Sequence, residues 1–192
     1  ETSPVCVFRT PKTPRREGSV GRPISDVEAR IRLSNGSTVC RGGPGELLIH
    51  GPPVMAGYYQ NPAATQAVLA DGWLWTGDVA RIDDNGLVYI VGRTKDVIIK
   101  NGYTVYPTEV EAVIGKSPQV ADVAVVGVPD EAAGEEIVAF VVPDGDLDIA
   151  ALELHVRAQL AHFKRPGKIE AVDGIPRGAK GQVLRAALAA ES

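Results

Sequence analysis

The chain has 192 residues, of which 44% are hydrophobic and 23% charged, a balance typical of a globular protein with one large domain or two small ones. Its formal net charge of −4 argues against a general affinity for nucleic acid, and no apolar run reaches the roughly 18 residues that a membrane-spanning helix needs. The two cysteines lack CxxC spacing, which argues against a zinc site and a disulfide framework.

The first half of the chain is rich in glycine and proline and is predicted to be mostly β-structure. A strand is expected at residues 46–49. A helix is expected over residues 62–69, because Asn61 is a preferred N-cap and proline is favoured at the first helical position. Residues 79–91 are predicted to form a hairpin with its turn at residues 83–86, which end in Asn-Gly.

The second half begins with short predicted strands at residues 97–99 and 103–106. Pro107 then opens a predicted helix, and Thr108 and Glu111 have the spacing of a capping box at its start. This spacing predicts that the two side chains satisfy backbone groups at the helix N-terminus.

The remainder of the chain continues the alternation of strands and helices. The β-branched run at residues 120–128 predicts a buried strand, and residues 136–142 predict a second one. Asp148 is expected to cap a helix whose apolar residues recur every fourth position. A last strand at residues 168–172 and a loop at residues 174–181 are expected before a short terminal helix.

The strongest signal in the sequence is an ordered series of distinct motifs, most of which contain glycine. They are GELLIHG at 45–51, GYY at 57–59, WLWTGD at 73–78, GRTKDVIIKNG at 92–102, VYPTEVE at 105–111 and IPRGAKGQVLR at 175–185. A single glycine motif is weak evidence, but a series in fixed order and spacing is specific. Over essentially the whole chain, this series resembles the superfamily of AMP-forming acyl-CoA synthetases, peptide-synthetase adenylation domains and luciferases.

The resemblance implies an α+β fold built from two parts. Residues 1–92 would be the β-rich end of a large domain, part of a distorted barrel. Residues 93–95 would be a hinge, and residues 96–192 a small mobile lid domain. The resemblance also leads us to expect a piece of a longer protein, because the family's phosphate loop, adenine site and most of its acyl pocket lie upstream of the part matched here.

The resemblance implies three residues at a nucleotide site. Asp78 matches an aspartate that holds the ribose hydroxyls, a task that suits a carboxylate because it accepts two hydrogen bonds. Arg93 matches an arginine that contacts the ribose and phosphate region, where a guanidinium fork binds oxygens well. Glu1 matches the glutamate associated with magnesium. The alternatives are a turn residue for Asp78 and a surface ion pair for Arg93.

Further roles are implied for the segment that follows. Lys95 falls at the position of the family's hinge residue, where backbone angles change as the lid domain rotates. Lys100, Asn101 and Gly102 lie where family members pass the pantetheine arm of CoA, and glycine lets a backbone approach a thin ligand closely. An exposed lysine at a strand edge remains the alternative for Lys95.

One position departs from the family pattern. Family enzymes place a lysine directly after the loop glycine in PxxxxGKxxR, and this chain has Gly181 followed by Gln182. A preorganised cation at that position can stabilise the transition state of adenylation by several kcal/mol. A register slip that offers Lys180 is the less favoured alternative, because Gly181 keeps the family spacing to Arg185. We therefore expect adenylation to be absent or weak.

The leading functional hypothesis is a ligase that joins a fatty or related carboxylic acid to CoA through an acyl-adenylate, using ATP and magnesium. It rests on the motif series and on the KDVII sequence that starts at Lys95. One alternative is an adenylation domain or acyl-AMP ligase that loads a carrier protein. Another is an inactive binding module. We expect the isolated chain to be inactive, and the whole protein to be cytoplasmic with no nucleic-acid partner.

Overall fold

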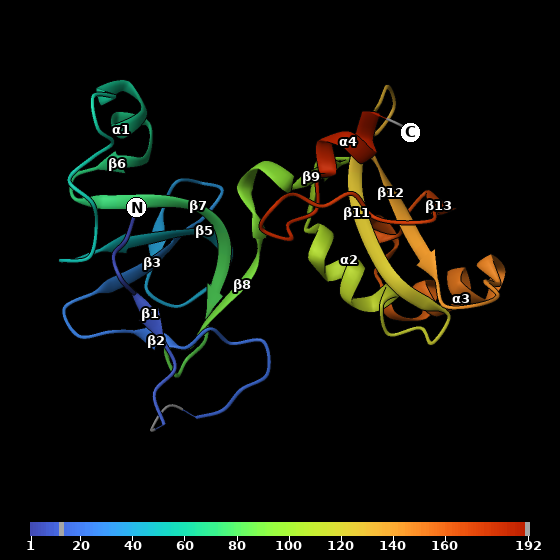
Figure 1. The fold of residues 1–192 in the computed structure, drawn as a ribbon, viewed down its shortest axis with the longest axis horizontal. Helices are drawn as coiled ribbons and strands as arrows, with labels where there is room; N and C mark the ends of the chain where they lie inside the picture. The colour runs from blue at the N-terminus through green and yellow to red at the C-terminus, as the bar shows by residue number, and fades with distance from the viewer. Residues whose placement is uncertain (12–13, 191–192) are drawn as a thin grey trace. The chain divides into compact units, whose positions relative to one another are not determined.

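The structure is a computed structural model that describes residues 1–11 and 14–190. The chain divides into two compact units, Glu1–Lys95 and Asp96–Ser192 (Figure 1). Strands predominate over helices, and the predicted α+β class is confirmed. Among the described residues, no helix is both long enough and apolar enough to cross a membrane.

The first unit is built on a six-stranded sheet with the order β4-β3-β5-β7-β6, in which β8 also pairs with β7 (Figure 1). Its strands are β3 (Glu28–Arg32), β4 (Thr38–Val39), β5 (Gly42–His50), β6 (Leu69–Ala70), β7 (Trp73–Ile82) and β8 (Val88–Arg93). A separate pair is formed by β1 (Val7–Phe8) and β2 (Arg22–Pro23). Within the described residues, the six strands do not close into a barrel.

The helix start and the hairpin turn predicted for the first unit are both confirmed. The helix α1 (Pro62–Val68) begins at the Asn61 cap, whose side chain accepts a hydrogen bond of 3.0 Å from the Ala64 backbone N–H. The predicted hairpin is formed by β7 and β8. The Asp83 carboxylate accepts hydrogen bonds of 2.9 Å from the backbone N–H groups of Asn85 and Leu87, which closes the turn.

The core of the first unit lies under the central strands. It consists of buried apolar side chains from β3, β5, β7, β8 and the segment just before β3: Val27, Ile31, Leu47, Ile49, Ala80, Ile82 and Val88. Ile31 and Ile49 are fully buried. Because side chains alternate between the two faces of a strand, burying these residues fixes which residues of β5 and β7 face the other way.

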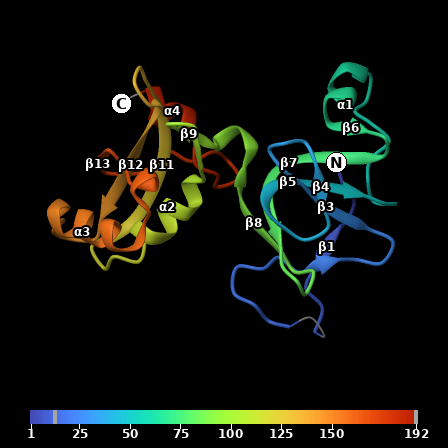
Figure 2. The ribbon, with the colours of Figure 1, turned by 180° about the vertical axis from the view of Figure 1, so that it is seen from behind.

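The second unit has a five-stranded sheet with the order β10-β9-β12-β11, and β13 runs parallel beside β12. The strands are β9 (Ile98–Lys100), β10 (Tyr103–Val105), β11 (Val120–Asp130), β12 (Gly134–Pro143) and β13 (Lys168–Ala171). The helices are α2 (Pro107–Ile114), α3 (Ile149–Gln159) and α4 (Arg185–Ala190). The reverse view shows α2 and α3 beside the long hairpin of β11 and β12 (Figure 2).

Both faces of the sheet are buried along the middle of β11 and β12. Val125 of β11 packs with Val110 of α2 and Val156 of α3 in one cluster. Val126, its neighbour in β11, packs with Leu188 of α4 in another cluster. The β-branched run of β11 is therefore buried, as predicted, although β11 stands at the end of the strand order, because helices cover this part of the sheet on both sides. The Asp148 cap of α3 is also confirmed, since its side chain accepts a 3.1 Å hydrogen bond from the Ala151 N–H.

The capping box predicted for α2 is wrong. The N-cap of the helix is Tyr106, which makes no side-chain capping bond, and Pro107 occupies the first turn. The Glu111 carboxylate instead accepts from the Val125 backbone N–H at 2.9 Å and from Arg185 Nη1 at 2.6 Å. The tertiary partners of Glu111 therefore replace the local bond that its spacing predicts, and its side chain is only 16% exposed.

Candidate functional site

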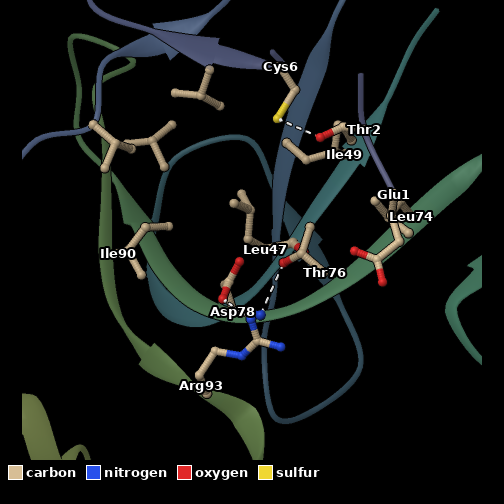
Figure 3. A pocket seen from close by; sticks show the side chains of 13 residues that line it. Glu1, Thr2, Cys6, Leu47, Ile49, Leu74, Thr76, Asp78, Ile90 and Arg93 are labelled. Atoms are coloured by element: carbon tan, nitrogen blue, oxygen red, sulfur yellow. Dashed lines mark hydrogen bonds and ion pairs between the residues drawn. The ribbon is translucent and has the colours of Figure 1, made fainter. Parts of the chain in front are cut away.

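A pocket of about 300 Å³ lies in the first unit, between β5, β7, β8 and the N-terminal segment. Its charged lining residues are Glu1, Asp78 and Arg93, which come from three separate parts of the chain. Figure 3 shows Asp78 and Arg93 pointing toward each other with Thr76 beside them. Apolar residues of the sheet, among them Leu47, line another part of the pocket.

The sheet itself brings Asp78 and Arg93 together. They are cross-strand partners on β7 and β8, and Arg93 Nη1 lies 2.9 Å from Asp78 Oδ1. Because the side chains are 30% and 52% exposed, an ion pair of this kind contributes about 0–1 kcal/mol to stability. The pair uses one oxygen and one nitrogen, so it orders both groups while leaving them further hydrogen-bonding capacity.

Glu1 is held at the pocket by two residues from the segment before α1. Its backbone carbonyl accepts a 2.8 Å hydrogen bond from the Met55 N–H, and its carboxylate accepts a hydrogen bond from the Tyr58 hydroxyl. This hydrogen bond, together with burial and the charge of Glu1, raises the pKa of Tyr58 above its ordinary value. Tyr58 therefore stays protonated and remains a donor to Glu1 at neutral pH.

The donor set of the pocket fits a magnesium ion that is bound mainly through a substrate. Among residues 1–11 and 14–190, no group of three or more His, Cys, Asp or Glu side chains could hold a metal ion. Magnesium commonly takes only one or two carboxylates from the protein, with phosphate oxygens and water as its other ligands. Glu1 meets that requirement as a single carboxylate.

Lys95 is the last residue of the first unit and lies in the short 3₁₀ helix Thr94–Asp96. Its side chain is exposed. The connection between the two units therefore passes through a single turn of helix that contains Lys95.

The residues expected at a CoA channel form the turn between β9 and β10. Asn101 and Gly102 both have positive φ, 51° and 77°, and the Asn101 N–H donates to the Ala133 carbonyl at 2.8 Å. The Lys100 ammonium pairs with Glu136, and the Lys100 side chain is only 14% exposed. Lys100 thus anchors the turn, while Asn101 and Gly102 are its exposed part.

Gln182 lies in the loop between β13 and α4 of the second unit. Its Oε1 atom accepts from the Lys180 N–H at 3.2 Å, and its backbone carbonyl accepts from the Gly178 N–H at 2.8 Å. A Cβ atom on Gly178 would collide with Gln182 Nε2, so the amide lies directly over that glycine. The side chain of Gln182 therefore folds back on its own loop.

Two family models match the chain, one in each of its two units. The AMP-binding enzyme family matches residues 1–59, and the AMP-binding enzyme C-terminal domain matches residues 109–182. The chain belongs to the AMP-binding enzymes. The resemblance to AMP-forming acyl-CoA synthetases that the motif series indicates is confirmed.

Relatives match nearly the whole length of this chain. A long-chain-fatty-acid–CoA ligase of Yersinia pestis is 41% identical over 96% of the chain and 33% of the relative. An indoleacetate–CoA ligase of Aromatoleum aromaticum is 40% identical over 96% of the chain and 37% of the relative. The ATP-bound structure of MatB from Rhodopseudomonas palustris matches with a TM-score of 0.87 and 38% identity, over 94% of the chain and 37% of MatB. The chain spans about a third of the length of these proteins.

Two residues near the pocket are missed by sequence reasoning. Tyr58 donates to Glu1 from the GYY motif, and Thr76 lines the pocket from the WLWTGD motif. Both residues lie inside motifs, which is the signal that could have found them. Their roles depend on partners at Glu1 and Leu47, which are far away in the sequence.

Proposed function

We propose that the protein is part of an ATP-dependent ligase that joins a fatty or related carboxylic acid to CoA. In the first step, a carboxylate oxygen attacks the α-phosphorus of ATP and displaces pyrophosphate, which gives an acyl-adenylate. In the second step, the CoA thiol attacks the acyl carbon and displaces AMP. The observation that carries this proposal is the convergence of Glu1, Asp78 and Arg93 on one pocket.

In this proposal, the pocket holds the ribose and phosphate part of the nucleotide. The Asp78 carboxylate accepts hydrogen bonds from the two ribose hydroxyls, and the Arg93 guanidinium contacts ribose and phosphate oxygens. Glu1, ordered by Tyr58, supplies a carboxylate to the magnesium ion that accompanies ATP. Magnesium, when bound, neutralises phosphate charge.

The second unit contributes to the second step in this proposal. Lys95 is the hinge about which this unit changes orientation between the two steps. The exposed turn of Asn101 and Gly102 lies along the path of the pantetheine arm. Lys100 supports the turn through its ion pair with Glu136 instead of contacting CoA.

Gln182 weakens the first step in this proposal. Glutamine has nearly the length of lysine, but its neutral amide cannot stabilise the charge that develops on the carboxylate and α-phosphate. The second step does not use this side chain. We therefore expect slow adenylation together with ordinary conversion of a supplied acyl-adenylate into a thioester, and we propose that both steps take place in the cytoplasm.

The proposal is tested with the full-length protein, ATP, magnesium, CoA and a panel of fatty and aryl carboxylic acids. Slow formation of acyl-CoA with AMP is expected. Asp78→Asn should raise the KM for ATP about tenfold, because an amide oxygen accepts hydroxyl protons more weakly than a carboxylate. The matched control is Asp84→Asn in the exposed turn between β7 and β8, which should leave the KM unchanged.

Two results would count against the proposal. Transfer of the acyl group to a phosphopantetheinylated carrier protein, with no transfer to CoA, would favour the carrier-loading alternative. The absence of ATP binding by the full-length protein would favour an inactive binding module.

A further inference from the structure

The pairing between β5 and β7 is irregular next to Asp78. Leu48 of β5 pairs with Trp75 of β7, whereas Glu46 pairs with Val79. Only Leu47 separates the two partners on β5, but the segment Thr76–Asp78 separates them on β7. This segment is therefore a β-bulge opposite Leu47. Bulges disrupt the ladder locally and turn a side chain to a new direction.

The Thr76 hydroxyl bridges a backbone carbonyl of β5 and the backbone N–H at the end of the bulge. Its Oγ1 donates to the Leu47 carbonyl at 2.8 Å and accepts from the Asp78 N–H at 3.1 Å. A hydroxyl can do both because it has one proton and two lone pairs. The first bond attaches Thr76, the first residue of the bulge, to β5. The second attaches the backbone of Asp78, its last residue, to the Thr76 side chain.

The middle of the bulge, Gly77, is fixed by its own backbone conformation and by contacts with Arg93 of β8 and with Thr94 directly after it. Gly77 has φ 68°, a left-handed conformation that glycine adopts without steric cost. Its carbonyl accepts from Thr94 Oγ1 at 3.3 Å. A Cβ on Gly77 would lie 3.4 Å from Arg93 Nη2, so the bulge lies close against the arginine that pairs with Asp78.

We propose that Thr76 is a positioning residue, whose hydroxyl holds the bulge in the shape that directs the Asp78 carboxylate into the pocket beside Arg93 (Figure 3). Thr76 acts through Asp78 and recognises no ligand itself. The ligand chemistry it serves is a vicinal diol, such as the hydroxyl pair of a ribose. This inference rests on the proposed nucleotide role of Asp78.

Two substitutions separate the hydroxyl from the shape of the side chain. Thr76→Val is nearly isosteric and removes the hydroxyl, whereas Thr76→Ser keeps the hydroxyl and removes only a methyl group. In the full-length protein, binding of ATP is compared with binding of 2′,3′-dideoxy-ATP, which lacks the diol. The wild type should prefer ATP by about tenfold or more.

The expected result is that Thr76→Val loses most of this preference and Thr76→Ser keeps it. A merely structural role would weaken the binding of both nucleotides equally and leave their ratio unchanged, so an unchanged ratio in Thr76→Val would overturn the inference. Equal weakening of the diol preference by Thr76→Ser would overturn it as well, because the hydroxyl would then not be the group that matters.

Amide hydrogen exchange provides a readout that needs no nucleotide. The Asp78 N–H should exchange at least about tenfold faster in Thr76→Val than in the wild type or in Thr76→Ser, because it loses its acceptor. Unchanged exchange in Thr76→Val would overturn the positioning role. If the wild type binds both nucleotides equally, the proposed role of Asp78 is wrong, and the exchange measurement still decides whether Thr76 holds the bulge.

Discussion

At the scale of single residues, Arg185 joins three segments of the second unit. Its Nη1 atom lies 2.6 Å from Glu111 Oε1 and donates to the Val125 carbonyl at 2.6 Å, while Nε lies 3.5 Å from Asp96 Oδ2. The Arg185 and Glu111 side chains are only 17% and 16% exposed. Removing one partner of such a pair leaves the other charge partly buried without compensation.

We therefore expect Glu111→Ala to lower the free energy of unfolding by about 2–3 kcal/mol, somewhat less than for a fully buried pair. Glu111→Gln should lose less, because its amide oxygen can still accept from the Val125 N–H. Urea titration followed by circular dichroism measures both values.

The matched control for this prediction is Glu109→Ala on the same helix. Glu109 pairs with Lys164, but its side chain is 43% exposed. An exposed pair contributes about 0–1 kcal/mol. If the losses in Glu111→Ala and Glu109→Ala were equal, the Arg185 cluster would have no special importance for stability.

At the scale of elements, the turn between β7 and β8 depends on one carboxylate. The N–H of Leu87 lowers the pKa of Asp83 most, and the Tyr89 hydroxyl, the Asn85 N–H and Arg81 lower it further against the opposing effect of burial. A folded-state pKa below the unfolded one means that the carboxylate stabilises the fold above the unfolded pKa. This contribution is lost as the pH falls through the folded pKa.

Asp83→Asn tests this directly, because an amide oxygen can keep accepting hydrogen bonds but does not titrate. We expect the wild type to be more stable than the variant at pH 6, and the difference to shrink as the pH falls below about 4, near the unfolded value for aspartate. Thermal unfolding at a series of pH values measures it. A stability difference that stays constant down to about pH 2 would refute the assignment.

Local patterns suffice to predict most helices and strands of this chain. Asn61 and Asp148 cap their helices through partners three residues away, and the turn at 83–86 is closed by its own carboxylate. The bulge at Thr76–Asp78 could not be predicted, because it exists only in the register between β5 and β7. The capping role predicted for Glu111 is wrong for the same reason, since Val125 and Arg185 compete with the local cap.

The candidate site, too, can be predicted only where local sequence carries the information. The family resemblance indicates Glu1, Asp78 and Arg93, and the structure brings all three to one pocket. The sequence does not reveal that Lys100 is already paired with Glu136, because the two residues are distant in the chain and share no local pattern. The motifs therefore identify candidate residues, and the tertiary contacts show which of their side chains are already paired within the protein.

At the scale of the whole molecule, the charged pocket belongs to the first unit, and Gln182 and the turn at Asn101 belong to the second. In the proposed ligase, each chemical step uses a different set of residues from the second unit. A change at Gln182 should therefore affect one step and leave the other unchanged, which distinguishes a catalytic effect from a loss of folding.

The most direct measurement compares the two half-reactions in the full-length protein carrying Gln182→Lys, with the neutral Gln182→Met as the control. ATP–pyrophosphate exchange reports adenylation, and acyl-CoA formation from a supplied acyl-adenylate reports the second step. We predict that Gln182→Lys accelerates exchange about 100-fold, that Gln182→Met does not, and that both leave thioester formation within about twofold. An unchanged exchange rate in Gln182→Lys would contradict the account.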